Sequence, residues 1–148
     1  MQVQNEIRLQ FPSLSANEGF ARMAVAAFAA PLDPTLDELA DLKTAVSEAV
    51  TNCIVHAYRD TVGTVYIHAR ILEGGRIVLK IRDRGVGIPD VAQAMEPMFT
   101  TDPGGERAGL GFAVMASFMD RLRVKSSVGT GTTVTMEKTI HSRRKIHG

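Results

Sequence analysis

The sequence predicts an α/β protein of two layers, in which helices cover one face of a mixed, mostly antiparallel sheet. Two segments in the first half of the chain carry apolar residues at the spacing of amphipathic helices. Two pairs of segments, at 65–81 and 122–138, alternate apolar and polar residues on either side of a short glycine-containing turn, as β-hairpins do. Helices and antiparallel hairpins in this order are typical of a two-layer sandwich.

The first elements are expected to be a strand and a helix. Residues 7–11 alternate apolar and polar side chains, which is the period of a strand with one buried face. Ser15 followed by Glu18 has the pattern of a capping box, so a helix should begin there and end before Pro31. The apolar positions that we expect on the buried face of this helix are Phe20, Met23, Ala24, Ala27 and Phe28.

A longer second helix is predicted over residues 35–58. Thr35 and Glu38 repeat the capping-box pattern at its start. The apolar positions that we expect in its core stripe are Leu39, Leu42, Val46, Ala49, Val50 and Cys53.

The rest of the chain is predicted to complete the sheet around one irregular region. A hairpin should turn at 73–75 and another at 129–131, where glycines interrupt the alternating segments. Residues 83–107 lack a clear period, apart from a short helix expected near 91–95, and a third long helix should follow at 110–119. Because long irregular stretches are unusual in compact domains, we expect the functional site there.

Length, charge and cysteine content exclude several classes of protein. The 148 residues fit one domain, which we place at 1–140, and the basic tail at 141–148 is expected to be disordered. A net charge of +1 argues against a nucleic-acid partner held by bulk electrostatics. Cys53, the single cysteine, cannot form an internal disulfide, and we interpret it as inert packing. Without a signal peptide or an apolar run of roughly 18 residues, we expect a cytoplasmic protein without a membrane partner.

A row of polar residues lies on the second predicted helix. Glu48, Asn52 and His56 are spaced four residues apart, so they share one helix face. Such a row is either a solvated helix edge or part of a site. Asn is unfavourable inside a helix, which favours a functional role for Asn52, whereas the role of His56 stays open.

Glycine-rich segments follow a predicted strand and precede a predicted helix. Asp83 comes directly after a strand, where it either caps a turn or accepts a hydrogen bond from an exocyclic amine such as that of adenine. Gly85 and Gly87 either supply positive φ or let a ligand approach the backbone. Gly109 and Gly111 stand before a helix, where free backbone N–H groups suit a phosphate. Each of these signals is weak by itself.

Their order and spacing resemble the GHKL ATPase/kinase superfamily, which implies its Bergerat-type ATP-binding fold. The four boxes of that superfamily correspond here to Glu48-x-x-x-Asn52, Asp83-x-Gly85-x-Gly87, Gly109-x-Gly111 and 129–133. A closer resemblance, to the anti-sigma factor serine kinases of spore-forming bacteria and within them the group that acts on sporulation sigma factors of the sigma F type, covers nearly the whole chain. It is carried by residues 20–28, 32–39, 43–52, 97–101 and 109–120. The chain departs from the pattern at Cys53 and Ala57, where small residues are usual, and at 104–105, where two glycines should loosen the lid.

The resemblance implies that the protein binds ATP or ADP with Mg²⁺. Asn52 would ligate Mg²⁺ through its amide oxygen, and Asp83 would hold the adenine amine, with Thr130 or Thr132 nearby. Thr101 would contact the nucleotide from the lid. The backbone donors to the phosphates would come from Gly109, Leu110 and Gly111.

The resemblance also implies a protein serine/threonine kinase with two protein partners. Glu48 corresponds to the general base of the family. Arg107 either neutralises charge on the terminal phosphate, in its own protomer or in that of the partner, or is an ordinary surface arginine. The partners would be a sigma factor and an anti-anti-sigma protein that carries the acceptor serine, and the protein would be a homodimer. Arg22, which lies off the predicted apolar stripe of its helix, would contact both partners.

Three alternatives remain at this point. A stress-response anti-sigma kinase would resemble the chain less in the lid and after the second glycine box. A detached histidine-kinase catalytic domain would need a phosphoacceptor helix pair, for which the residues before Ile7 are too few. An ATP-gated binding module without kinase activity would not need Glu48.

Overall fold

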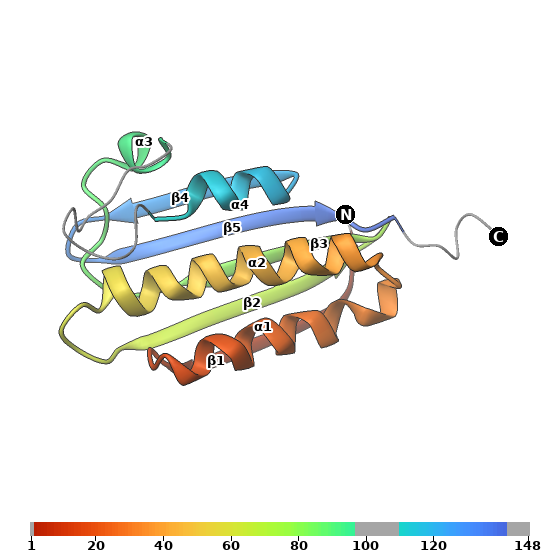
Figure 1. Ribbon diagram of the computed structural model, residues 1–148, viewed down its shortest axis with the longest axis horizontal. Coiled ribbons are helices and arrows are strands. Elements are labelled where there is room, and N and C mark those ends of the chain that lie inside the picture. The colour runs from red at the N-terminus through yellow and green to blue at the C-terminus, as the bar shows by residue number, and fades with distance from the viewer. Residues whose placement is uncertain (1, 97–109, 142–148) are drawn as a thin grey trace.

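The computed structural model describes residues 2–96 and 110–141. Figure 1 shows the elements along the chain. The strands and helices of the N-terminal part are β1 (Val3–Pro12), α1 (Ala16–Ala29), the 3₁₀ turn η1 (Ala30–Leu32), α2 (Leu36–Asn52) and the π-helical turn η2 (Cys53–Ala57). The remaining elements are β2 (Thr64–Leu72), β3 (Arg76–Arg82), α3 (Val91–Ala94), α4 (Phe112–Phe118), β4 (Arg121–Ser127) and β5 (Gly131–Thr139).

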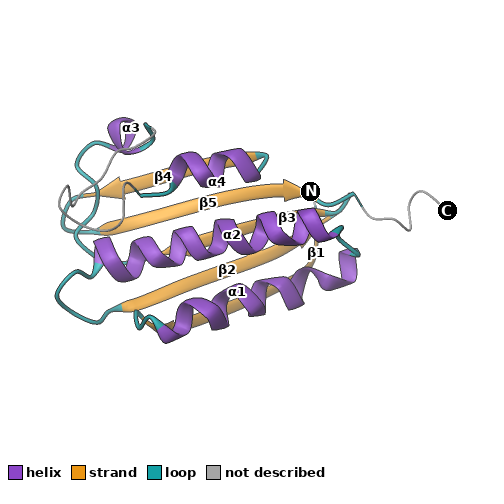
Figure 2. Cartoon of the chain, viewed as in Figure 1, coloured by secondary structure: helices purple, strands orange, loops and turns teal. Residues whose placement is uncertain are grey.

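The strands form one five-stranded sheet in the order β1-β2-β3-β5-β4. All four described pairings are antiparallel, so no parallel pair occurs within the described strands. Figure 2 shows α1, α2 and α4 side by side on one face of the sheet. The two-layer α/β architecture predicted from the sequence is therefore confirmed, as are both hairpins and the short helix at α3.

The core lies between the sheet and the helices. In β2 and β3 the odd-numbered residues, such as Ile67 and Leu79, point toward the helices and are buried. In β5 the even-numbered residues that pair with them, such as Val134 and Met136, do so. The stripe predicted for α2 is confirmed, because all its members are buried except Leu39, which is half-buried. The predicted helix continues beyond Asn52 as the π-helical turn η2.

The stripe predicted for α1 is wrong except at Phe28, which is buried. Phe20 and Met23 are each 55% exposed, and the buried residues of the helix are Ala21, Val25, Ala26, Phe28 and Ala29. Small side chains spaced four residues apart let α1 pack closely against α2. The Phe20 ring instead meets the edge of the Phe11 ring, with their centroids 6.4 Å apart.

Only one of the two predicted capping boxes forms. Thr35 Oγ1 accepts a hydrogen bond from the Glu38 N–H at 3.1 Å, and Glu38 Oε1 accepts from the Thr35 N–H at 2.9 Å. Ser15 makes no side-chain cap hydrogen bond, because its backbone is already helical rather than extended. The Ser15–Glu18 box expected from the sequence is therefore wrong, although the helix begins where it was predicted.

No helix within residues 2–96 and 110–141 combines the length and the hydropathy that a membrane-spanning helix requires.

Candidate functional site

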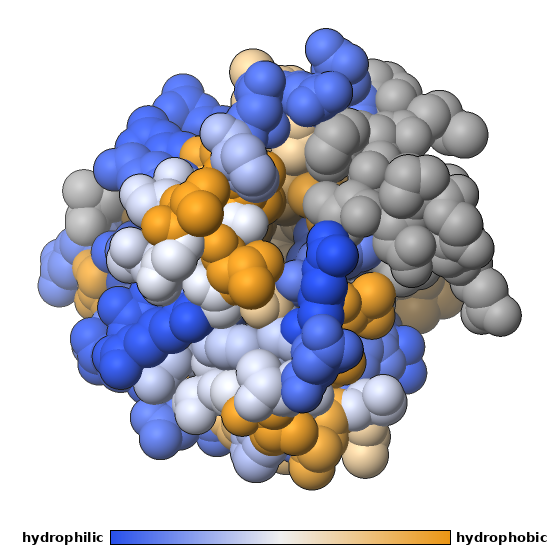
Figure 3. Space-filling view, turned by 90° about the vertical axis from the view of Figure 1, so that its left-hand side faces the viewer, coloured by the Kyte–Doolittle hydropathy of each residue, from blue (hydrophilic) through white to orange (hydrophobic). Residues whose placement is uncertain are grey.

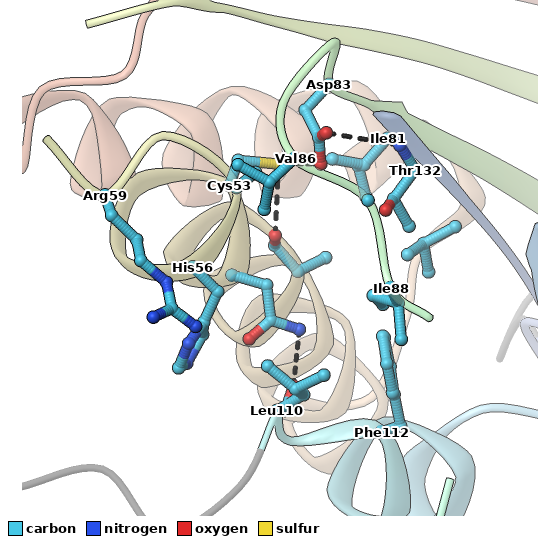
Figure 4. Close-up of a pocket in the computed structure, with 15 residues that line it drawn as sticks. Cys53, His56, Arg59, Ile81, Asp83, Val86, Ile88, Leu110, Phe112 and Thr132 are labelled. Atoms are coloured by element: carbon cyan, nitrogen blue, oxygen red, sulfur yellow. Dashed lines mark hydrogen bonds between the residues drawn. The ribbon is translucent and has the colours of Figure 1, made fainter. Parts of the chain in front are cut away.

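A pocket lies between the C-terminal part of α2, the loop after β3 and the start of α4 (Figure 4). It brings together residues that are far apart in the sequence, including Asn52, Asp83, Leu110 and Thr132, all of which were candidates from the sequence. The full lining consists of Ala49, Asn52, Cys53, His56, Ala57, Arg59, Ile81, Asp83, Val86, Gly87, Ile88, Leu110, Phe112, Thr132 and Val134. The lining is largely apolar with a few convergent polar groups, which is the usual composition of a small-molecule site.

Asp83 follows β3 and is held in a fixed orientation. Its Oδ1 accepts hydrogen bonds from the Gly85 N–H at 2.9 Å and from the Thr132 N–H at 3.2 Å. Its Oδ2 accepts only a weak thiol hydrogen bond from Cys53 Sγ, at 3.6 Å. Burial raises the pKa of the Asp83 carboxyl, and the two backbone N–H groups and the thiol oppose that rise. The residue thus presents one oxygen that is available to an amine donor in the pocket.

Asn52 connects α2 to the segment that precedes α4. Its Nδ2 donates a hydrogen bond to the carbonyl oxygen of Leu110, 58 positions away in the sequence. Its Oδ1 is buried and has no hydrogen-bond partner among the described residues. A buried oxygen without a donor is costly, and a hard cation such as Mg²⁺ prefers oxygen ligands. The amide oxygen therefore fits the ligand role expected for it.

Glu48 lies one helical turn before Asn52 and against the second glycine box. A Cβ atom added to Gly111 would overlap Glu48 Oε2, and Gly111 has φ = 71°. Both facts require glycine at this position. The carboxylate of Glu48 therefore lies beside the entry to α4, next to the pocket, although it is not part of the pocket lining.

The glycines of the first glycine box lie in close contact with neighbouring backbone. A Cβ atom on Gly85 would overlap the backbone oxygen of Ala57, and one on Gly87 would overlap that of Ser127. The Val86 N–H donates to the Ala57 carbonyl at 3.1 Å. These glycines let the loop pack against η2 and the β4–β5 hairpin. Gly87 also lines the pocket and has φ = 79°, and the ligand contact expected of these glycines stays a prediction.

Of the two threonines proposed near Asp83, the structure places Thr132 in the pocket. Thr132 is buried, and its Oγ1 is 2.7 Å from Ser126 Oγ. Thr130 is exposed in the hairpin turn and does not line the pocket.

Cys53 was interpreted as inert packing, and its contact with Asp83 was not foreseen. Burial, and next the charge of Asp83, raise the pKa of the Cys53 thiol well above its usual range. The thiol therefore stays protonated and unreactive, as expected, while it also donates to the carboxylate. The sequence signal that could have found this contact is the position of Cys53 directly after Asn52 on the pocket-lining helix.

His56 and Arg59 lie together at one side of the pocket, on and just after η2 (Figure 4). This end of the molecule faces the viewer in Figure 3, where hydrophobic surface lies between hydrophilic groups. Val62, Val86 and Val128, which belong to loops at this end, are exposed.

The other site candidates lie elsewhere. Thr101, Arg107 and Gly109 fall outside the described residues. Arg22 is on α1, away from the pocket lining, with its side chain 41% exposed and paired with Glu18 at 3.3 Å.

Comparison with known proteins places this geometry in a family. Residues 11–138 match the family described as histidine kinase-like ATPase domain. An anti-sigma F factor of Caldanaerobacter subterraneus subsp. tengcongensis is 55% identical over 144 residues, covering 97% of this chain and 100% of that protein. An anti-sigma F factor of Geobacillus kaustophilus is 51% identical over 138 residues, covering 93% of this chain and 94% of that protein. Among solved structures, the RsbU and RsbW domains of Rv1364c from Mycobacterium tuberculosis have a similar fold, with a TM-score of 0.69 and 18% identity over 95% of this chain and 34% of that one.

Proposed function

Since this chain belongs to the anti-sigma F factors, which are built on the histidine kinase-like ATPase domain, we propose that it inhibits a sigma factor of the sigma F type in an ATP-dependent way. We also propose that it phosphorylates a serine of the anti-anti-sigma protein that antagonises it. Both activities belong to a cytoplasmic homodimer that acts during sporulation. The kinase-type ATPase fold, common to the family, supplies the nucleotide site for them.

The observation that carries the proposal is the arrangement around Asp83. Its Oδ1 is occupied by two backbone N–H groups, so Oδ2 is the oxygen left for the exocyclic amine of adenine. The apolar residues Ile81, Ile88 and Val134 line the same pocket and suit the faces of a purine ring. Asp83 Oδ2 would therefore accept a hydrogen bond from the adenine amine.

Asn52 and the start of α4 would hold the phosphates of the nucleotide. Mg²⁺, bound through Asn52 Oδ1, would neutralise the charge of the phosphates during transfer. By the family resemblance, the backbone N–H groups of Leu110 and Gly111 would donate to the phosphates, and the same role is expected of Gly109, Thr101 and Arg107, which lie outside the described residues. Glu48, one helical turn from Asn52, would receive the proton of the acceptor serine. Since the transition state of phosphoryl transfer is loose, positioning and charge neutralisation contribute more than proton removal.

Incubating the protein with labelled ATP and a candidate anti-anti-sigma protein tests the kinase proposal. Label on a serine of that protein, identified by mass spectrometry, is the expected result. Sigma-factor binding without any label on the antagonist would instead describe an ATP-gated binding module.

The role of Asn52 gives the first quantitative prediction. Asn52→Ala should weaken ATP binding by about tenfold or more in Mg²⁺, because it removes the amide oxygen that ligates the metal. Affinity in EDTA should change much less. Calorimetric titration of the wild type and the variant under both conditions makes the comparison. The substitution also removes the hydrogen bond from Asn52 to the Leu110 carbonyl, so circular dichroism is used to check that the variant remains folded. Equal losses with and without Mg²⁺ would show that Asn52 has no ligand role.

Arg22 belongs to a helix, α1, that exposes residue types common in protein interfaces. Phe20 and Met23, close to it in the sequence of α1, are exposed apolar side chains. Interfaces are enriched in aromatic residues, Met and Arg, and the arginine fork pairs bidentately with carboxylates. We place both protein partners on this surface, where two copies of Arg22 in a dimer would flank a shared docking area. Phosphorylation of the antagonist would weaken its binding to this surface, which would release the surface for the sigma factor.

Arg22→Glu should cost at least about 2 kcal/mol with either partner, which is the scale of an interface hot spot, and leave ATP binding intact. Arg121→Glu makes the same charge change on the opposite face of the sheet and serves as the control. Calorimetry of each variant with each partner in saturating ATP gives the comparison. Wild-type affinity of the Arg22 variant for both partners would refute the shared surface.

A further inference from the structure

The face of the sheet opposite the helices carries a strong positive charge. Figure 1 shows α1, α2 and α4 on one side of the sheet, and none of the described helices lies on the other side. Among the described residues, only Glu6 and Glu137 are acidic on the strands of this uncovered face. The cationic side chains on it are Arg8, Arg70, Arg76, Lys80, Arg82, Arg84, Arg121, Arg123 and Lys125. The chain as a whole has a net charge of only +1, so its charge is distributed very unevenly.

The strand register arranges these cations in rows. One row crosses all five strands, with the members Arg8, His68, Lys80, Thr135 and Arg123. The next row consists of Gln10, Tyr66, Arg82, Thr133 and Lys125. The threonines of β5 separate the cations of β3 (Lys80 and Arg82) from those of β4 (Arg123 and Lys125). These cations therefore form two columns, one along each strand. The columns lie roughly 10 Å apart, which is twice the spacing of neighbouring strands.

The cations of these two columns are largely uncompensated. Glu6 is engaged with His68 at 2.8 Å and with Arg8 at 3.8 Å, and Glu137 with Arg76 at 3.8 Å. Within the part of the chain that the structure describes, Lys80, Arg123 and Lys125 have no acidic partner. Unpaired, exposed cations of this density repel one another and favour binding of an anion.

Two shallow hollows on the face are lined by the same side chains. One, of about 300 Å³, includes Arg8, Lys80 and Arg82. The other, of about 360 Å³, includes Arg82, Arg84 and Lys125, together with hydroxyl groups of the β4–β5 hairpin. The guanidinium groups of Arg82 and Arg84 lie 4.8 and 5.1 Å from the centre of the Tyr66 ring, which fixes them in place.

We propose that this uncovered face binds double-stranded DNA through its phosphate backbone, without sequence preference. Protein partners need an apolar centre in the interface, and Val78, in the middle of this face, is only 3% exposed. Interfaces with DNA are polar and positively charged. Two phosphate ridges flank grooves that are roughly 6 and 12 Å wide, a separation that two cation columns roughly 10 Å apart can follow. The low net charge had argued against a nucleic-acid partner, but net charge does not report how charges are distributed.

The test is binding of a fluorescent DNA duplex of mixed sequence to the full chain, measured by anisotropy at several salt concentrations. At about 50 mM salt we expect a Kd in the micromolar range, and the logarithm of the affinity should fall linearly with the logarithm of the salt concentration. Arg123→Glu should lower the affinity about tenfold and reduce the salt slope by about one. Lys43→Glu makes the same charge change on α2, in the helix layer, and should change the affinity by less than about twofold.

Unchanged ADP affinity, together with an unchanged circular dichroism spectrum, shows that both variants are folded, since neither residue lines the pocket. Absence of wild-type binding at low salt would overturn the proposal, and so would equal losses in the two variants, which would indicate attraction by net charge alone. In a competition experiment, unlabelled DNA and poly-glutamate are compared at equal concentrations of negative charge. If poly-glutamate displaces the duplex at the lower concentration, the DNA proposal is overturned in favour of an acidic protein partner.

Discussion

Asp83→Asn should abolish detectable ATP binding and leave the fold intact. Oδ1 of Asp83 accepts two backbone N–H groups, so the asparagine must keep its oxygen on that side. Its amide nitrogen then takes the place of Oδ2, where it faces the adenine amine as a second donor. One charge-assisted hydrogen bond is lost and two donors oppose each other, which together should weaken binding by about 100-fold or more.

The stability of this variant should not fall, because the ionised carboxylate is itself unfavourable where it lies. Burial raises the pKa of Asp83, so the folded state loses stability as the pH rises through that pKa, and a neutral side chain avoids this cost. Calorimetry with ADP and thermal unfolding at neutral pH measure the two effects. Asp37→Asn, an exposed aspartate in the first turn of α2, is the matched control for binding and should keep wild-type ADP affinity. Its own stability should fall by about 0.3–1 kcal/mol, because a carboxylate is favourable at a helix N-terminus. Retained ADP affinity in a folded Asp83 variant would contradict the adenine assignment.

Glu48→Gln should slow phosphoryl transfer by about 100-fold and leave ATP and sigma-factor binding within about twofold of wild type. General bases contribute roughly 100- to 10,000-fold, and a loose transition state places Glu48 at the low end of that range. The glutamine keeps the size of the side chain against Gly111, so the start of α4 is preserved.

Single-turnover transfer from labelled ATP to the antagonist measures this effect separately from binding. Glu73→Gln, in the exposed β2–β3 turn, is the control substitution. A Glu48 variant that transfers phosphate at the normal rate would show that the carboxylate only packs beside the glycine box.

Sequence patterns predicted the parts of the fold in which local chemistry and tertiary packing agree. The α2 stripe was correct because its apolar residues occupy only one face of the helix. In α1 apolar residues surround the helix, so periodicity could not tell which face is buried, and the small residues at Ala21, Val25 and Ala29 decided it. Ser15 and Thr35 carry the same cap pattern, yet only Thr35 has the extended backbone that lets its side chain accept the hydrogen bond.

The site was predictable where residue types and spacing define it, as for Asp83 and Asn52. The contacts that orient these two residues were not predicted, although the position of Cys53 next to Asn52 was a signal for one of them. The Cys53 thiol, the Thr132 N–H and the Leu110 carbonyl reach them from segments 30 to 58 positions away. Such contacts depend on how whole elements pack, which a single sequence does not encode in any local pattern.

The assembly of the pocket from these distant segments links nucleotide supply to the lifetime of the chain. Because α2, the loop after β3, β5 and the start of α4 meet only in the native state, an unfolded chain has no site for the nucleotide. Ligands that bind only the native state stabilise it by mass action, by about 2.7 kcal/mol at a concentration of 100 times Kd. With the proposed ATP and ADP binding, a smaller total pool of the two nucleotides would leave a larger unfolded fraction of this protein, and proteases that degrade unfolded chains would remove it faster.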